Sequence, residues 1–131
     1  MDVQKAIDYW LENALDAQDT ADTLFENQKY HHALFFGQLA LESVIKAYVL
    51  FATKDHALPI HDLVKLLRKT ELTLSEEQKQ ELNEISAFNL EARYPKDKQL
   101  LFQKASREFT QTWLAKIKEY CAWFTQTLIQ K

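Results

Sequence analysis

Glycine and proline are scarce in this sequence, which has one Gly and two Pro among its 131 residues. Sandwiches and barrels of β-strands need frequent tight turns, and such turns draw heavily on these two residue types. Their scarcity predicts few turns and long elements, which means helices. The single glycine, Gly37, also excludes any phosphate-binding loop with a G-x-G motif.

Cysteine and long apolar runs are also lacking. Cys121 is the only cysteine, so neither a disulfide framework nor a thiolate metal cluster can form. It lies in an apolar helical stretch, where we expect it to be a small buried side chain. No apolar run approaches the ~18 residues of a membrane span, and the chain does not open with a signal-peptide pattern. These features predict a cytoplasmic protein without membrane contact.

An excess of positive charge is missing too, because the net charge is −3 and the pI is near 5.8. Bulk electrostatics therefore cannot hold nucleic acid, although a local basic site is compatible with this charge. Apolar residues, in contrast, make up 47% of the chain. A chain of this length and composition can bury a proper core, and we expect one domain over residues 1–131.

Apolar residues recur at spacings of three and four along most of the chain, as in amphipathic helices. Residues 30–53 are apolar on more than one face, which predicts a central position. Ser75 to Gln78 form a capping box that should start a helix. We expect helices at about 2–26, 30–53, 61–70, 76–88 and 100–129. The predicted fold is all-α, an antiparallel up-and-down bundle of four long helices plus one short helix.

One charged pair lies within the apolar central helix. Glu42 and Lys46 are four residues apart with the favourable polarity, so they form either a surface or half-buried ion pair or the lining of a polar groove with Arg93. A buried charge needs partners. We expect Arg93, which is followed by the rigid corner Tyr94-Pro95, to turn inward to Glu42.

The histidines do not have the spacing of a metal site. His31, His32, His56 and His61 include no i, i+4 pair on one helix and no H-E-x-x-H motif. His61 and Asp62 are expected to open the short helix, with a local capping role. Since no Ser/His/Asp arrangement or CxxC motif is present either, we assign no catalytic residue, no metal and no cofactor.

Large aromatic residues are concentrated in the first and last helices. One small bundle need not bury all of them, so some should form an exposed patch that closes in a homodimer. The residues concerned are Trp10, Phe109, Trp113, Trp123 and Phe124.

Four stretches of the sequence, taken in order and spacing, resemble the HEPN domain (higher eukaryotes and prokaryotes nucleotide-binding). They read YHHALFFGQLALE from Tyr30, KA from Lys46, PIHDL from Pro59 and FNLEARYP from Phe88. The resemblance covers nearly the whole chain and implies a helical bundle that usually forms a homodimer. It also implies a partner, a minimal nucleotidyltransferase, in a toxin–antitoxin pair.

Many members of the wider family are metal-independent RNases that use an Arg followed, four to six residues later, by a His. This sequence departs from the pattern, because no histidine follows Arg93 and His61 is the last one. The general base is missing, which argues against RNase activity and favours a structural or binding role for Arg93-Tyr94-Pro95.

The sequence therefore predicts a dimeric binding module that pairs with a nucleotidyltransferase, with a nucleotide or RNA as a further ligand. The alternatives are an RNase toxin with a non-standard site and a purely structural assembly domain. The candidate residues of a ligand-binding or polar groove are Glu42, Lys46, Asp62, Arg93 and Tyr94.

Overall fold

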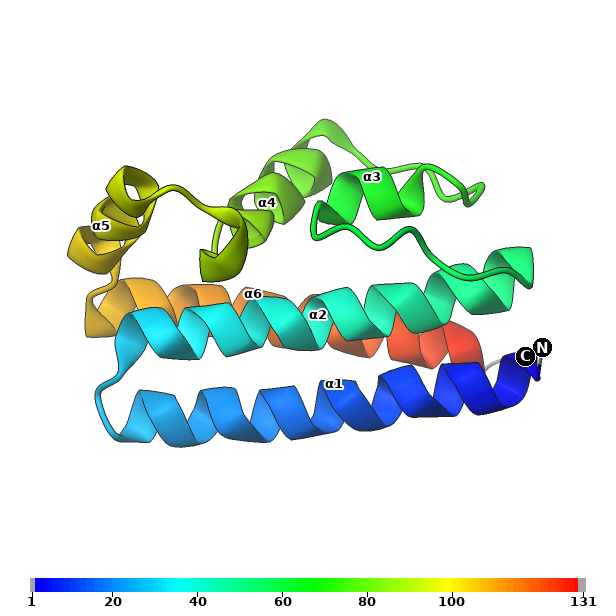
Figure 1. Ribbon diagram of the computed structural model, residues 1–131, viewed down its shortest axis with the longest axis horizontal. Helices are drawn as coiled ribbons and strands as arrows, with labels where there is room; N and C mark the ends of the chain where they lie inside the picture. Colours follow the sequence, from blue (N-terminus) through cyan, green and yellow to red (C-terminus); the bar gives the residue numbers. More distant parts are fainter. Residues whose placement is uncertain (1, 130–131) are drawn as a thin grey trace.

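Three long helices run along the long axis in the computed structural model, which describes residues 2–129. They are α1 (Val3–Glu26), α2 (Tyr30–Thr53) and α6 (Arg107–Ile129). Shorter elements cover one side of α2, namely α3 (Leu63–Leu67), α4 (Glu76–Ser86), the 3-10 turn η1 (Leu90–Ala92) and α5 (Pro95–Lys104) (Figure 1). The described chain is 78% helical, with six helices and no strand. The predicted all-α class is confirmed.

The first helical hairpin agrees closely with its prediction, and local signals explain why. Asp2 caps α1 by accepting a hydrogen bond from the Lys5 N–H at 3.1 Å. The buried face of α1 includes Ala14, Ala17 and Ala21, whose small side chains allow α1 to lie close against α2. The two helices run antiparallel, as predicted (Figure 1).

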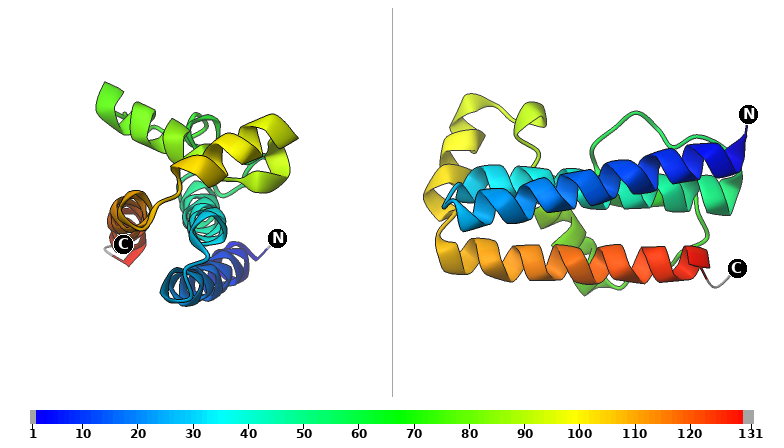
Figure 2. Two further views of the ribbon diagram at one scale, coloured as in Figure 1. Left: turned by 90° about the vertical axis from the view of Figure 1, so that its left-hand side faces the viewer. Right: turned by 90° about the horizontal axis from the view of Figure 1, so that it is seen from below.

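The central helix α2 contacts both α1 and α6, and α3 to α5 lie over its remaining side (Figure 2). A Cβ atom on Gly37 would come within 2.9 Å of Leu114 and 3.0 Å of Ile117, so this glycine permits the close approach of α6. By length and composition alone, α2 is apolar enough to cross a membrane. However, 72% of its most apolar window is buried inside the protein, and packing in the core accounts for its hydropathy.

The short helix and the capping box lie where the sequence places them. The short helix is α3, which is shorter than the predicted 61–70 and begins after its N-cap Asp62. Helix α4 begins at the capping box, in which Ser75 Oγ accepts from the Gln78 N–H at 3.1 Å and the Gln78 side chain accepts from the Ser75 N–H at 2.9 Å.

The last part of the chain differs from its prediction in three ways. The expected connection over 89–98 is shorter, because Pro95 starts α5 at a helix position where a missing N–H costs nothing. The expected last helix is divided into two helices, because α5 ends at Lys104 and α6 begins at Arg107. Ser106 Oγ accepts from the Phe109 N–H at 3.1 Å and caps the start of α6. Helix α6 also runs parallel to α2, because the short elements bring the chain back to the end where α2 begins (Figures 1 and 2).

Most of the large aromatic residues pack inward. Phe88 lies edge-on to Phe109 and Trp113, with ring centroids 6.1 and 5.7 Å away. Phe124 is fully buried, whereas Trp123 is exposed. The aromatic patch is thus smaller than expected, and the homodimer stays a prediction. Cys121 is buried as predicted, and burial raises the pKa of its thiol to about 12.

Candidate functional site

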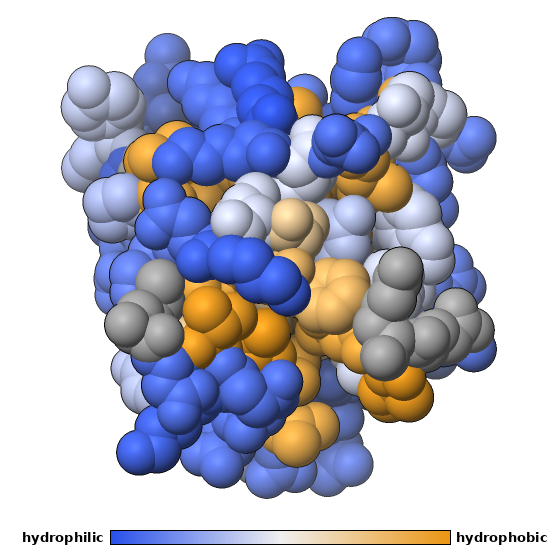
Figure 3. All heavy atoms as spheres, turned by 90° about the vertical axis from the view of Figure 1, so that its right-hand side faces the viewer, coloured by the Kyte–Doolittle hydropathy of each residue, from blue (hydrophilic) through white to orange (hydrophobic). Residues whose placement is uncertain are grey.

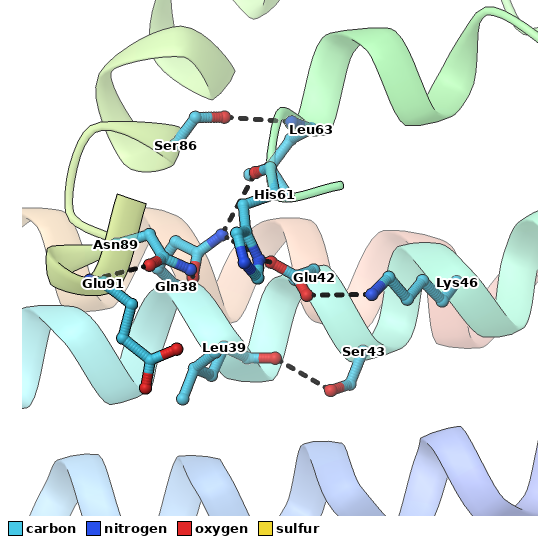
Figure 4. A network of polar contacts seen from close by, with 10 residues as sticks. All are labelled: Gln38, Leu39, Glu42, Ser43, Lys46, His61, Leu63, Ser86, Asn89 and Glu91. Carbon is cyan, nitrogen blue, oxygen red and sulfur yellow. Dashed lines mark hydrogen bonds and ion pairs between the residues drawn. The ribbon is translucent and has the colours of Figure 1, made fainter. Parts of the chain in front are cut away.

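A cluster of polar side chains lies between the middle of α2 and the segments that cross it before α3 and after α4 (Figure 4). The cluster consists of Gln38, Glu42, Lys46, His61 and Asn89. Gln38 and Asn89 are both 0% exposed, and Glu42 and Lys46 are also buried. Burial of so many polar groups is costly unless each finds a partner, so their hydrogen bonds define what this site can do.

Glu42 is the centre of the cluster. One carboxylate oxygen, Oε1, accepts from Gln38 Nε2 at 3.0 Å and lies 2.8 Å from His61 Nδ1. The other, Oε2, accepts from Lys46 Nζ at 3.0 Å. The Lys46 ammonium also lies 4.9 Å from the centroid of the Trp10 ring, which adds a cation–π contact. Glu42 and Lys46 are therefore paired, as their spacing predicts, and the pair is buried.

Gln38 and Asn89, which are not among the residues predicted from the sequence, extend the cluster along the same face of α2 towards its N-terminal end (Figure 4). Gln38 Oε1 accepts from Asn89 Nδ2 at 3.0 Å, and Asn89 Oδ1 accepts from the Glu91 N–H at 3.1 Å. Gln38 Nε2 is also 3.4 Å from the His61 carbonyl oxygen. The only sequence signal for this pair is a polar residue within each of two apolar stretches. The cluster ties together α2, the connection before α3 and the segment after α4.

The prediction that Arg93 turns inward to Glu42 is wrong. Turn η1 carries the chain away from α2, and Arg93 lies exposed beside a surface hollow that Asp97 and Lys104 also line. The carboxylate of Glu42 is meanwhile occupied by nearer partners. Tyr94, the neighbour of Arg93, is 80% exposed.

Asp62 does not line the buried cluster either. Its carboxylate accepts from the Lys65 N–H at 3.0 Å and caps α3. The candidate residues therefore separate into a buried pair, a helix cap and an exposed pair, and they do not form one groove.

His61 has a larger role than the capping role predicted for it. Its Nδ1 faces Glu42, while its side chain is 42% exposed. A carboxylate that holds one imidazole nitrogen fixes the orientation and tautomer of the ring and leaves Nε2 for another contact. His61 is thus the one member of the cluster that is both oriented from inside and open to solvent.

A second polar cluster joins α4 to α6. Glu81 accepts from Lys116 Nζ at 2.7 Å and from the Tyr120 hydroxyl at 2.6 Å. These two hydrogen bonds lower the pKa of the Glu81 carboxyl. Burial, followed by the hydrogen bond to Glu81, raises the pKa of Tyr120, so its hydroxyl remains a donor. This cluster links α4 to α6 through charge-assisted hydrogen bonds.

Within residues 2–129, no group of three or more His, Cys, Asp or Glu side chains is arranged to hold a metal ion.

The helical architecture and the buried polar cluster describe the domain, and a comparison with protein families identifies the family to which it belongs. The model of the HEPN domain matches residues 7–127, so the chain belongs to the HEPN family. A solved structure, TT1696 from Thermus thermophilus, is similar with a TM-score of 0.75 and 18% identity, covering 92% of this chain and 96% of the other. At this identity the similarity shows the fold alone. A search of curated proteins gives no match.

Proposed function

We propose that this HEPN domain is a dimeric binding module that pairs with a minimal nucleotidyltransferase in a toxin–antitoxin-like system and contributes to nucleotide binding. Its membership of the family supports the class of protein. The observation that carries the proposal is a basic surface with exposed apolar side chains around α5. This surface, called the α5 surface below, comprises Arg93, Tyr94, Lys96, Lys98, Leu100, Phe102 and Lys104.

Positive charge is concentrated at the α5 surface in a chain that is acidic as a whole. Residues 93–104, which contain this surface, include four basic residues and one acidic residue, a net charge of +3, whereas the whole chain carries −3. Charge separation of this kind steers an acidic partner to one side of a protein and raises the rate of association. The α5 surface is therefore the part of the molecule best suited to meet an acidic protein.

Apolar side chains lie among these charges. Tyr94 is 80% exposed, Leu100 is 51% exposed and Phe102 is 43% exposed. Aromatic residues and arginine are enriched at the energetic centres of protein interfaces. The carboxylate of Glu42 in the buried cluster, by contrast, forms its hydrogen bonds with Gln38, Lys46 and His61 inside the protein. Exposed side chains on the α5 surface, together with hydrogen bonds of the buried cluster that are already satisfied, favour a binding role over a catalytic one.

A separate apolar surface supports the dimer. At the end of the bundle where α1 begins and α2 and α6 end, a hollow shows apolar side chains to solvent (Figure 3). Its apolar lining consists of Val3, Ile7, Leu11, Phe51, Leu128 and Ile129, and Gln4 and Lys54 also border it. Contiguous apolar surface of this kind is typical of protein–protein contacts. It lies at the opposite end of the bundle from α5 (Figure 1), so one chain can contact a second copy and a different partner together.

The proposal is tested first by finding whether a minimal nucleotidyltransferase is encoded beside this gene, and then by co-expressing that protein with this chain. We expect the two proteins to co-elute, and we expect Lys96→Glu/Lys98→Glu to weaken binding about tenfold by placing like charges opposite an acidic partner. The matched control is Lys65→Glu/Lys69→Glu, which makes the same charge change at the exposed end of α3. Calorimetric titration measures both. Failure of the parent chain to bind contradicts the proposed function, and equal weakening by both variants places the interface elsewhere.

A second candidate function, RNA cleavage, is favoured by one observation. The 2.8 Å contact of His61 Nδ1 with Glu42 orients a partly exposed imidazole, as in general bases. We nevertheless expect no cleavage of single-stranded RNA or tRNA by the purified protein in EDTA, because Arg93 is not part of the same cluster to hold the phosphate. Cleavage that survives further purification and is lost in His61→Gln and Arg93→Ala would replace the binding module by an RNase. A chain that binds neither partner nor nucleotide would be a structural assembly domain.

A further inference from the structure

The start of α2 contacts α5 through a group of tilted aromatic rings. The centroid of the His31 ring lies 4.0 Å from that of Phe102 on α5 and 4.1 Å from that of His32. His31 and His32 occupy the first turn of α2, directly after its N-cap Lys29. In the described structure, this helix end has neither a side-chain cap nor an acidic residue in its first turn. Both histidines therefore lie at the positive end of the helix dipole without a compensating carboxylate.

Helix α5 has few other attachments among the described residues. Its buried side chain is Leu101, and its N-cap Tyr94 makes no side-chain capping bond. The ion pair between Lys104 and Glu84 is 3.9 Å long and exposed, so it adds little. The contact between the His31 and Phe102 rings therefore contributes, together with Leu101, to holding α5 against α2.

A proton on His31 is unfavourable in this position. Burial lowers the pKa of His31, and the positive charges of His32 and Lys29 lower it further. Attraction between an imidazolium and the Phe102 ring favours the protonated form of His31. Burial, the charges of His32 and Lys29, and the helix dipole all disfavour the protonated form. The neighbouring elements present charged groups of both signs, namely Glu26 on α1, Lys96, Asp97, Lys98 and Lys104 on α5, and Arg107 and Glu108 on α6. None of these is among the charges that set the pKa of His31.

We propose that His31 is a pH-sensitive latch, which holds α5 on α2 while the imidazole is neutral and releases α5 when the imidazole is protonated. Because the folded state disfavours the proton, the contribution of the latch is complete above the ordinary histidine pKa of 6.5 and is lost as the pH falls below it. Release uncovers Leu101 and changes the position of the α5 surface. The latch does not depend on the identity of any partner.

Hydrogen exchange of the wild-type chain at pH 7.5 and 5.0, corrected for intrinsic rates, tests the latch. We expect the protection of amides 98–105 to fall about two- to fivefold at the lower pH, the size expected for one unfavourable charge at a helix end. Amides in the middle of α2 should keep their protection. His31→Phe retains a ring against Phe102 but cannot titrate, so its α5 protection should not depend on pH. The control His56→Gln removes an exposed histidine and should behave as the wild type does.

Two results would overturn the latch. One is a wild-type chain whose α5 protection is unchanged at pH 5.0, and the other is a His31→Phe variant with the full wild-type fall. An NMR titration of the wild-type imidazoles gives a further measurement that needs no variant. His31 should titrate below the ordinary histidine pKa of 6.5, and titration at or above that value contradicts the proposal.

Discussion

Replacement of Glu42 by glutamine is expected to lower the free energy of unfolding by about 3–5 kcal/mol. The variant keeps the shape of the side chain, but it leaves the buried Lys46 ammonium without its counter-ion and removes the charge that faces His61. An ion pair inside a protein is costly to break from one side, because the remaining charge stays desolvated. Urea denaturation followed by circular dichroism at pH 7 measures the change.

Two comparisons show whether burial causes this loss. Glu76→Gln removes a carboxylate that pairs with Lys79 at 3.4 Å in solvent, and its effect should stay below about 0.5 kcal/mol. The double variant Glu42→Gln/Lys46→Met should be more stable than Glu42→Gln alone, because it removes the unpaired charge together with its partner. A loss in Glu42→Gln no greater than that in Glu76→Gln would mean that the buried cluster does not stabilise the fold.

The features that the sequence predicts correctly depend on neighbouring residues. Helix α2 begins and ends where its apolar pattern does, and α4 begins at the capping box of Ser75 and Gln78. The pair of Glu42 and Lys46 forms because four residues separate them on one helix. Each of these contacts is fixed by spacing within one helix, so no knowledge of the tertiary structure is needed.

The features that the sequence does not predict depend on residues far apart in the chain. Gln38 and Asn89 are separated by 51 positions, and Glu42 and His61 by 19. No helical period links such positions, and the contacts exist only because two segments cross α2. His61 is assigned to a local cap on sequence grounds for this reason, although its ring belongs to the cluster.

The error at Arg93 has a physical cause of the same kind. Proline can interrupt a helix or begin one, and the sequence around Pro95 does not decide between the two. Because Pro95 begins α5, Arg93 and Tyr94 form the short connection between η1 and this helix, and Arg93 does not turn inward to the central helix. The direction of its side chain follows from the path of the chain, which local patterns do not specify.

Phe88→Ala should also lower the free energy of unfolding by about 3–5 kcal/mol, the range for loss of a buried phenylalanine. Phe88 is 1% exposed and lies edge-on to Phe109 and Trp113 on α6, so truncation leaves a cavity between two helices. It also precedes Asn89, whose side chain donates to Gln38 at 3.0 Å. Loss of the aromatic anchor should therefore loosen the segment that leads into the α5 surface.

The matched control makes the same substitution at an exposed ring. Phe102→Ala removes a side chain that is 43% exposed and stacked on His31, so its cost should be about 1 kcal/mol or less. Urea denaturation of both variants gives the comparison, and hydrogen exchange of amides 88–95 shows whether the loosening is local. Equal costs for the two substitutions would mean that Phe88 is not the anchor between α4 and α6. A large loss of unfolding free energy in Phe88→Ala alone would mean that the aromatic residues of α6 belong to the core. Through Phe88 they would then stabilise the segment that leads into the α5 surface.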